Sequence, residues 1–173
     1  TRRLTEWRTG ERMIILGPLG RGFVLPAGAR RIALLGRGIG TCSLTALGAA
    51  AARRGVVVDA LVSARHPGAL VGSEAYRAGG VRMVSEVVDS DGSSDPGTVA
   101  AWLARCCEAG VDHIYTCGSE RLLRLATDLA GSCGAHVQVS LEAHMACGLG
   151  YCHGCATGHP GRARETPLVC RDG

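Results

Sequence analysis

Hydrophobic and polar positions alternate along the chain in a way that predicts strands and helices in turn. Short aliphatic and β-branched runs predict buried strands, over Arg31–Gly36, Val56–Ser63, Val81–Val88, Asp112–Gly118 and His136–Glu142. Segments with apolar residues at helical spacing predict helices between them, over Thr41–Arg54, Ser73–Ala78, Thr98–Gly110 and Ser119–Ser132. This alternation builds a parallel sheet with helices on both faces, so we expect the α/β fold class.

Turn-forming residues separate the α/β region from segments on either side of it. Before it, Arg12–Gly17 has the pattern of a short buried strand, and a glycine-rich loop follows. After it, a stretch rich in glycine and cysteine leads to Pro167–Cys170, which predicts a short closing strand. We therefore expect three parts: residues 1–28 as a leading segment and linker, 29–141 as a nucleotide-binding-like α/β domain, and 142–173 as a small cysteine lobe.

Composition limits the class of protein. The chain has 173 residues, of which 46% are hydrophobic but only 3% aromatic, so we expect a core of Ala, Val, Leu and Ile. No uncharged apolar run is long enough to span a membrane, and no apolar segment follows the first arginines, so we expect neither a membrane span nor a signal peptide. The net charge is +4, and scattered arginines with few aromatic residues argue against nucleic-acid binding.

Nine cysteines are many for a chain without an export signal, and they favour a cytoplasmic metal site over disulfides. Cys147, Cys152 and Cys155 have the spacing C-x4-C-x2-C, and Cys170 follows further along. This is the spacing of plant-type [2Fe–2S] proteins. Glycines among the cysteines permit the tight curl that brings three thiolates around one cluster. The sequence therefore predicts a [2Fe–2S] cluster on these four cysteines.

Two other interpretations of the cysteine lobe stay open. Zinc could use the same four thiolates or replace one of them with His153 or His159, and disulfides could join the cysteines. Structural zinc sites usually pair two short cysteine knuckles, whereas this lobe has one, which favours the iron–sulfur interpretation. Outside the lobe, four cysteines on or beside expected helices are predicted to be small buried apolar residues, namely Cys42, Cys106, Cys107 and Cys133.

Two strand-to-helix turns carry glycine at the edge where open α/β sheets bind ligands. In the first, Gly36, Gly38 and Gly40 let the backbone and a helix N-terminus approach a phosphate. In the second, Cys117 and Gly118 follow the end of another strand. The first turn does not match the G-x-G-x-x-G fingerprint, but two such turns on one sheet predict a nucleotide site.

These motifs together resemble a known family. The stretches SLEAHMACGLGYCHGC and VCRDG are similar to the C-terminus of the electron-transfer subunit of type B dihydroorotate dehydrogenase, and the similarity continues upstream through LGPLGRGF, GRGIG, SDGSSDPG and YTCGSERLL. The resemblance implies a ferredoxin-reductase-like flavoprotein with FAD on an N-terminal barrel, NAD(H) on the α/β domain and a C-terminal [2Fe–2S] cluster. It also implies a partner, a catalytic subunit whose FMN oxidises dihydroorotate to orotate.

The resemblance extends to individual residues. It implies that the first glycine turn lies near the pyridine-nucleotide phosphates, and that Cys117 and Gly118 lie near the nicotinamide and the flavin. The chain also departs from the family's pattern, because Arg37 replaces a glycine, Cys42 and Ser43 stand where an Ala-Pro pair is usual, and Ser119 replaces a proline. Such changes can narrow the dinucleotide site or abolish it. Residues 1–28 would be the remnant of the barrel's end, opening at its last strand.

The expected function follows from counting electrons. A hydride carrier moves two electrons and one [2Fe–2S] cluster moves one, so a flavin must stand between them. We expect an iron–sulfur electron-transfer subunit that passes single electrons between a partner flavoprotein dehydrogenase and FAD or NAD(H) in the cytoplasm. Two alternatives are a complete NAD(H) reductase whose FAD barrel is absent from this chain, and a non-catalytic interaction module stabilised by its metal.

Overall fold

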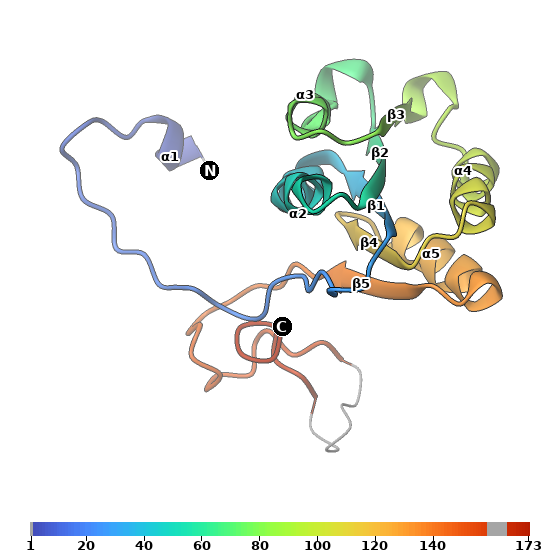
Figure 1. Cartoon of the computed structure of the whole chain (residues 1–173). Coiled ribbons are helices and arrows are strands. Elements are labelled where there is room, and N and C mark those ends of the chain that lie inside the picture. The colour runs from blue at the N-terminus through green and yellow to red at the C-terminus, as the bar shows by residue number, and fades with distance from the viewer. Residues whose placement is uncertain (1, 159–165) are drawn as a thin grey trace. The chain divides into compact units, whose positions relative to one another are not determined.

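A computed structural model of the protein describes residues 2–158 and 166–173, and these fall into two units. One unit is contiguous, Gly22–Glu142, and holds the strands labelled in Figure 1. The other unit combines Thr1–Arg21 with Ala143–Gly173 and contains the cysteine motif. Its regular structure includes one short helix, α1 (Arg2–Thr5).

The contiguous unit is built on a five-stranded sheet in the order β3-β2-β1-β4-β5. The strands are β1 (Arg31–Arg37), β2 (Val57–Ala64), β3 (Met83–Val88), β4 (His113–Cys117) and β5 (His136–Ser140). Every pairing is parallel, and the central strand β1 sets Leu34 beside Ala60 of β2 and Tyr115 of β4. All five carboxyl ends therefore meet at one edge of the sheet.

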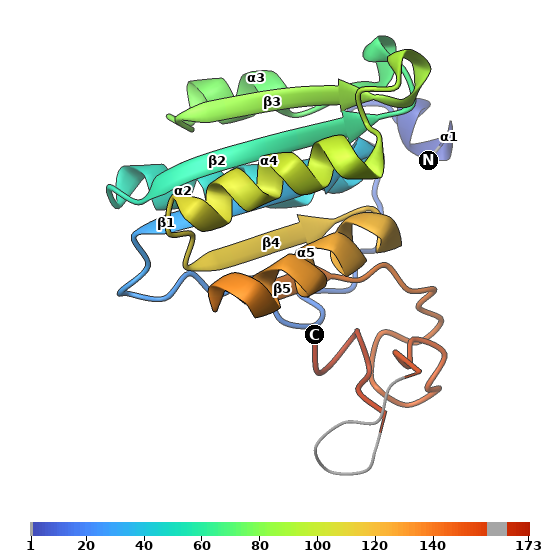
Figure 2. The ribbon, with the colours of Figure 1, turned by 90° about the vertical axis from the view of Figure 1, so that its right-hand side faces the viewer.

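Helices cover both faces of this sheet. They are α2 (Cys42–Arg53), α3 (Ser73–Ala78), α4 (Pro96–Glu108) and α5 (Glu120–Cys133), with short 3-10 turns at Gly38–Thr41, Pro67–Ala69 and Asp89–Asp91. In Figure 2, α4 and α5 lie in front of the sheet, and α2 and α3 lie behind it. The expected α/β alternation is confirmed. Within the described part of the chain, no helix has the length and apolar character needed to cross a membrane.

The alternation of side chains along β1 explains why both faces are covered. Ile32 and Leu34 join the core under α2 and α3, whereas Ala33 and Leu35 join the core under α4 and α5. All four side chains are fully buried. A strand buried on both faces has a continuous apolar sequence, so the aliphatic run of β1 places it at the centre of the sheet.

The sheet also carries buried polar groups. The Asp59 carboxylate on β2 is buried and accepts hydrogen bonds from the guanidinium groups of Arg31, at 2.8 Å, and Arg82, at 2.5 Å. The imidazole rings of His113 on β4 and His136 on β5 stack with their centroids 5.3 Å apart. Burial, and to a lesser degree the neighbouring His136, lowers the pKa of His113.

Two strands expected outside the sheet are wrong. Arg12–Gly17 has no strand conformation, and its apolar side chains are exposed, with Ile14 at 100% and Ile15 at 77%. A strand needs a hydrogen-bonded neighbour and an apolar surface to cover it, and the described residues supply neither here. Pro167–Cys170 makes only an isolated bridge, from Leu168 to Ala156, before the chain turns.

Candidate metal centre and nucleotide edge

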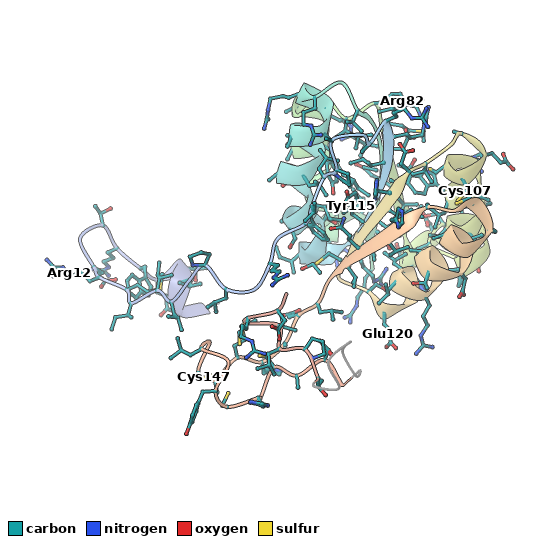
Figure 3. The ribbon with its side chains drawn as sticks, turned by 60° about the horizontal axis from the view of Figure 1, so that its bottom comes forward. Arg12, Arg82, Cys107, Tyr115, Glu120 and Cys147 are labelled. Carbon is teal, nitrogen blue, oxygen red and sulfur yellow. The ribbon has the colours of Figure 1, made fainter. Side chains whose placement is uncertain are left out.

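The cysteine-bearing unit is organised by turns, and Figure 3 labels Cys147 at the first of them. Gly148, with φ +67°, and Gly150, with φ +75°, adopt the left-handed backbone conformation, so the chain curls back directly after Cys147. A side chain at position 148 would also collide with Leu16, whose Cδ2 lies 2.6 Å from the position of a Cβ. The first cysteine is therefore held in a curled loop that packs onto an earlier segment of the chain.

Cys147 and Cys152 form one end of the motif. The backbone N–H groups of Leu149, at 3.3 Å, and Cys152, at 3.4 Å, donate to Cys147 Sγ. The N–H of Gly154 donates to Cys152 Sγ at 3.5 Å. The backbone N–H of Cys152, followed by that of Leu149, lowers the pKa of the Cys147 thiol to about 6. The loop therefore favours the thiolate, which is the form that binds metal.

Cys155 and Cys170 form the other end of the motif. Both are buried, with their Sγ atoms 3.3 Å apart, and Leu168 completes the core between them. The backbone holds this pair in place, because Val169 N–H donates to the Cys155 carbonyl at 3.1 Å and Gly20 N–H donates to the Cys170 carbonyl at 2.7 Å. The backbone N–H of Cys170 lowers the pKa of Cys155, whereas the hydrogen-bonded Cys155 thiol raises that of Cys170.

The structure thus brings the four cysteines together as two pairs. Among residues 2–158 and 166–173, no three His, Cys, Asp or Glu side chains gather closely enough to hold a metal ion. Two thiol pairs with N–H groups directed at sulfur suit a binuclear iron–sulfur cluster, which takes two thiolates on each iron, whereas one zinc ion needs four ligands around one point. All nine cysteines are free. His153 is exposed, and His159 lies outside the described residues.

At the carboxyl edge of the sheet, the two predicted glycine turns pack directly on each other. A Cβ at Gly40 would stand 2.7 Å from Gly118 Cα, and a Cβ at Gly118 would stand 2.3 Å from the carbonyl oxygen of Arg37. Gly36 packs on Thr41 within the first turn, so a side chain there would collide with it. These turns place Gly36, Gly40, Cys117 and Gly118 together at the ends of β1 and β4. Gly38 has open space around it.

Arg37, which departs from the family's glycine pattern, has partners that the sequence did not reveal. Its guanidinium group donates to the Asp89 carboxylate at 2.6 and 3.2 Å and to Ser63 Oγ at 2.7 Å. The Arg37 hydrogen bond, followed by that of Ser94, lowers the pKa of Asp89 to about 2. Arg121 adds a longer ion pair to Asp89 at 3.9 Å. Because these partners follow or end different strands, only the folded sheet brings them together.

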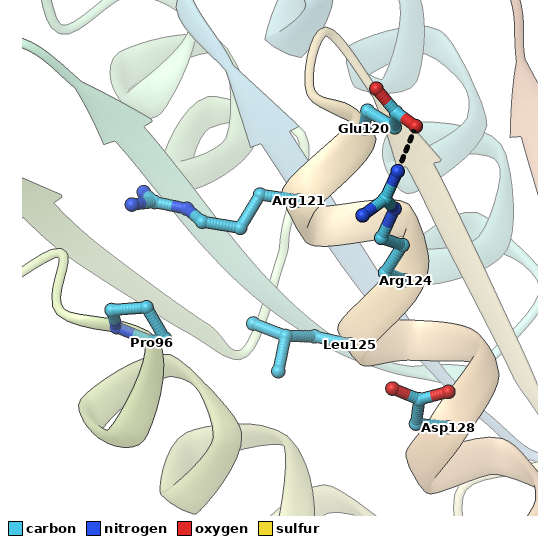
Figure 4. Close-up of a pocket in the computed structure, with 6 residues that line it drawn as sticks. All are labelled: Pro96, Glu120, Arg121, Arg124, Leu125 and Asp128. Atoms are coloured by element: carbon cyan, nitrogen blue, oxygen red, sulfur yellow. Dashed lines mark hydrogen bonds and ion pairs between the residues drawn. The ribbon is translucent and has the colours of Figure 1, made fainter.

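A shallow pocket of about 380 Å³ lies between the beginnings of α4 and α5 (Figure 4). Its lining consists of Pro96, Glu120, Arg121, Arg124, Leu125 and Asp128. Arg124 forms an ion pair with Glu120 at 2.6 Å, and Arg121 forms one with Asp89. The positive charge of the lining is therefore already partnered within the chain.

The cysteines outside the motif follow the sequence prediction in part. Cys106 is buried at 3% exposure, as predicted, whereas Cys42 is exposed, so its predicted burial is wrong. Cys42 is the first residue of α2 and lies beyond the apolar face that packs on the sheet. Cys107 and Cys133 are half-buried at the margin of the core. Cys117 lies at the carboxyl end of β4, as predicted.

Comparison with known protein families gives a match to the cysteine lobe. A family model described as the iron-sulfur cluster binding domain of dihydroorotate dehydrogenase B matches residues 142–173. The matched segment contains all four cysteines of the motif and both of the thiol pairs. The lobe is therefore similar to an iron–sulfur binding domain.

Curated relatives match almost the whole chain. The electron transfer subunit of dihydroorotate dehydrogenase B (NAD(+)) from Bacillus caldolyticus is 32% identical over 98% of this chain and 65% of its own length. A probable subunit of the same name from Methanothermobacter thermautotrophicus is 36% identical over 84% of this chain and 53% of its own length. The chain thus spans 65% or less of the length of these two relatives.

Solved structures share the fold at lower identity. The structure of an NADH-dependent reduced ferredoxin-NADP oxidoreductase covers 99% of this chain and 61% of its own, with a TM-score of 0.73 and 22% identity. The C-terminal domain of the PF1911 hydrogenase from Pyrococcus furiosus covers 72% of this chain and all of its own, with a TM-score of 0.58 and 18% identity. These likenesses show that the chain shares its α/β fold with both structures.

Proposed function

We propose that the chain belongs to the family of the electron transfer subunits of dihydroorotate dehydrogenase B, to which it is similar over nearly its whole length. In this role it would pass single electrons between a partner flavoprotein dehydrogenase and FAD or NAD(H). The observation that supports this most directly is the arrangement of the four cysteines as two thiol pairs inside the matched cluster-binding segment. The proposed ligands of a [2Fe–2S] cluster are Cys147, Cys152, Cys155 and Cys170.

A cluster of this kind supplies reversible one-electron transfer. The chain's own residues prepare its site in two ways. The N–H groups of Leu149, Cys152 and Gly154 neutralise negative charge that collects on sulfur. The burial of Cys155 and Cys170 around Leu168 keeps water from one side of the site. The N–H donors stabilise the more negative, reduced state, whereas the burial disfavours it, so donors and burial act in opposite directions on the reduction potential.

The glycine edge of the sheet is the proposed dinucleotide site. Gly36, Gly38 and Gly40 would face the phosphates, and Cys117 and Gly118 would face the reacting rings. The packed glycine turns support this, because they leave backbone without side chains at the carboxyl edge, where parallel sheets bind nucleotides. The proposed division of labour is residues 1–28 for the end of the FAD-binding part, 29–141 for NAD(H), and 142–173 for the cluster.

The proposed partner is the catalytic subunit of a dihydroorotate dehydrogenase with FMN, in the cytoplasm. Electrons would then run from that flavin through the cluster to FAD and NAD⁺. One observation favours the second candidate, a complete reductase whose FAD-binding part is supplied from outside this chain. The apolar segment Met13–Leu16 is exposed and carries no strand pairing. This is expected of a segment that pairs with strands supplied by another chain.

Metal, sulfide and spectra test the cluster. The chain purified without oxygen should contain about two irons and two acid-labile sulfides, absorb in the visible, and give an EPR signal after reduction. Each of Cys147→Ser, Cys152→Ser, Cys155→Ser and Cys170→Ser should reduce the iron content, whereas Cys42→Ser, at an exposed position outside the lobe, should leave it unchanged. A colourless protein that binds zinc and takes up no electron would contradict the proposal.

Flavin and nucleotide binding are measured separately on the same protein. Release of FAD on heating would favour the complete reductase. Binding of FAD only after an FAD-binding domain is added as a second chain would favour it as well. Titration of NADH into the chain tests the glycine edge, and Gly40→Ala, whose new methyl would meet Gly118, should weaken that binding. Iron content should not change in this variant, so failure of the nucleotide site is distinguished from failure of the cluster.

A further inference from the structure

Two cysteines that the proposed function does not use meet at the margin of the α/β unit. Cys107 lies in the last turn of α4, and Cys133 is the last residue of α5. Their Sγ atoms are 2.6 Å apart, although the two residues are 26 positions apart in the sequence. Figure 3 labels Cys107 at this end of α4, with the end of α5 beside it.

The surroundings single out this pair from its neighbours. Cys106 is adjacent in sequence, but its side chain is buried in the core at 3% exposure, and Cys42 is exposed on α2. Cys107 and Cys133 are both half-buried, at the edge of the same core cluster. They are thus close enough to each other to react and sufficiently open for a small reagent to reach them.

The backbone on either side fixes both sulfur positions. α4 ends at Glu108 and α5 at Cys133, and each helix is followed by a glycine with positive φ, Gly110 at +79° and Gly134 at +72°. The chain then enters β4 and β5, which pair with each other in the sheet. Because neighbouring parallel strands anchor both helix ends, the two thiols face each other without any rearrangement of the backbone.

We propose that Cys107 and Cys133 form a reversible redox site, in which a disulfide bond joins the C-terminal ends of α4 and α5. The oxidant is a low-molecular-weight disulfide of the glutathione type. The two thiols give up two protons and two electrons, and one Sγ–Sγ bond forms between them. The S–S bond of the oxidant breaks, and it leaves as two thiols, so atoms and electrons balance.

The order of the two half-reactions follows from burial. Burial, and secondarily the neighbouring Cys133, raises the pKa of the Cys107 thiol to about 12, which makes Cys107 a poor first nucleophile. Cys133 therefore attacks the oxidant first and forms a mixed disulfide. Cys107 then displaces the small thiol from Cys133 and completes the bond, because it already lies against that sulfur.

The disulfide bond would stabilise the part of the α/β unit that carries the second glycine turn. The loop closed between Cys107 and Cys133 contains β4 and the Cys117–Gly118 turn. Cross-linking a loop of this length removes conformational entropy from the unfolded chain. We expect the thermal midpoint of the α/β unit to be about 10 °C higher in the oxidised form than in the reduced form.

Peptide mapping tests the proposal on the full chain. The protein is incubated with glutathione disulfide or with dithiothreitol, its free thiols are alkylated, and it is cut with trypsin and Glu-C. These proteases release Cys106–Glu108 and Leu125–Glu142, which separates Cys107 and Cys133 from Cys117 and from the cluster ligands. The expected product is a cross-linked pair of these peptides, lighter than their sum by two hydrogen atoms, which dithiothreitol removes.

Variants decide which sulfurs take part. Cys107→Ser and Cys133→Ser should each abolish the cross-link, whereas Cys42→Ser should keep it. Cys107→Ser should accumulate the mixed disulfide on Cys133, and Cys133→Ser should not accumulate one on Cys107. Cys106 and Cys107 lie in the same released peptide, so cleavage of the peptide bond between them in the mass spectrometer shows which of the two is linked. This avoids a substitution of Cys106, which is buried in the core. A link through Cys106, or no link in glutathione disulfide, would overturn the proposal.

The thermal midpoint supplies a second measurement. Oxidation should raise the thermal midpoint in the wild-type protein and not in the double variant Cys107→Ser/Cys133→Ser. Both proteins receive the same oxidant, so any effect of the oxidant on the proposed cluster is common to both. Equal shifts in the two proteins would mean that the midpoint reports the cluster and not the proposed bond. Because the cluster ligands are intact in all these variants, the outcome is independent of whether the proposed electron-transfer function holds.

Discussion

Replacing Gly118 with alanine tests how tightly the two turns at the carboxyl edge of the sheet are packed. Gly118 has a φ of +92°, and a Cβ there would stand 2.3 Å from the carbonyl oxygen of Arg37 and 3.3 Å from Gly40 Cα. The atoms that a methyl group would meet belong to the backbone. Rotation of a side chain therefore cannot relieve the contact, and β1 and β4 would have to move apart.

The expected cost has two parts. The left-handed conformation costs an L-residue roughly 1–2 kcal/mol, and forcing a methyl group into a packed site costs roughly 1–3 kcal/mol. We expect Gly118→Ala to lower the free energy of unfolding by about 3 kcal/mol. Gly110 is the matched control, because its φ is +79° but nothing lies within 4 Å of its Cβ position. Gly110→Ala should therefore cost only the first part.

Urea denaturation measures both variants. Trp102 in α4 is 4% exposed and reports unfolding of the α/β unit by fluorescence, and a Trp7→Phe background removes the signal of the exposed tryptophan in the other unit. The midpoint should fall further for Gly118→Ala than for Gly110→Ala, with similar slopes. If the two costs agree to within about 0.5 kcal/mol, contact with the Arg37 carbonyl does not constrain position 118.

Charged and titratable groups of the same unit give three more predictions. Asp59→Asn should lower the free energy of unfolding in urea by about 3 kcal/mol, because it leaves the partly buried Arg31 without its counter-charge; a loss below about 1 kcal/mol would contradict this. Burial lowers the pKa of His113, so the unfolded chain binds more protons, and stability should fall as the pH drops below about 6.5. The urea midpoint should therefore change less with pH in His113→Gln than in the wild type. An equal dependence on pH in the two proteins would show that His113 is not the group responsible. Arg37→Gly should raise the pKa of Asp89 in an NMR titration, since Arg37 is the main cause of its value of about 2; in the wild type, the stabilisation from Asp89 is present above pH 3.8 and is lost as the pH falls through about 2.

The arrangement of strands and helices was predictable because each element carries its own pattern. β1 is apolar on both faces, and α5 has a Ser119 cap that accepts a hydrogen bond from Leu122 N–H and an apolar face that includes Leu122. Such signals are local, so they survive without knowledge of the rest of the fold. The four-cysteine spacing is also local, and it predicted the lobe that the family comparison matches.

The parts that could not be predicted depend on contacts between distant residues. Arg12–Gly17 has a strand-like pattern, but pattern cannot supply a neighbouring strand. The meeting of Cys107 with Cys133 depends on how α4 and α5 rotate and where each ends, to within a fraction of a turn. The Arg37–Asp89 ion pair likewise joins the ends of two strands that are not adjacent in the sheet order.

The cysteine-bearing unit draws its two segments from sites far apart in the chain. The N–H of Gly20 donates to the carbonyl of Cys170, and Leu16 lies against Gly148. In the sequence, the whole of Gly22–Glu142 separates these partners. During synthesis on the ribosome the contiguous α/β unit can fold as soon as it has emerged, whereas the lobe must wait until Cys170 leaves the exit tunnel. The cysteine lobe is therefore completed after the α/β unit, and nascent chains stalled after Cys155 would present three thiols of the motif without their fourth.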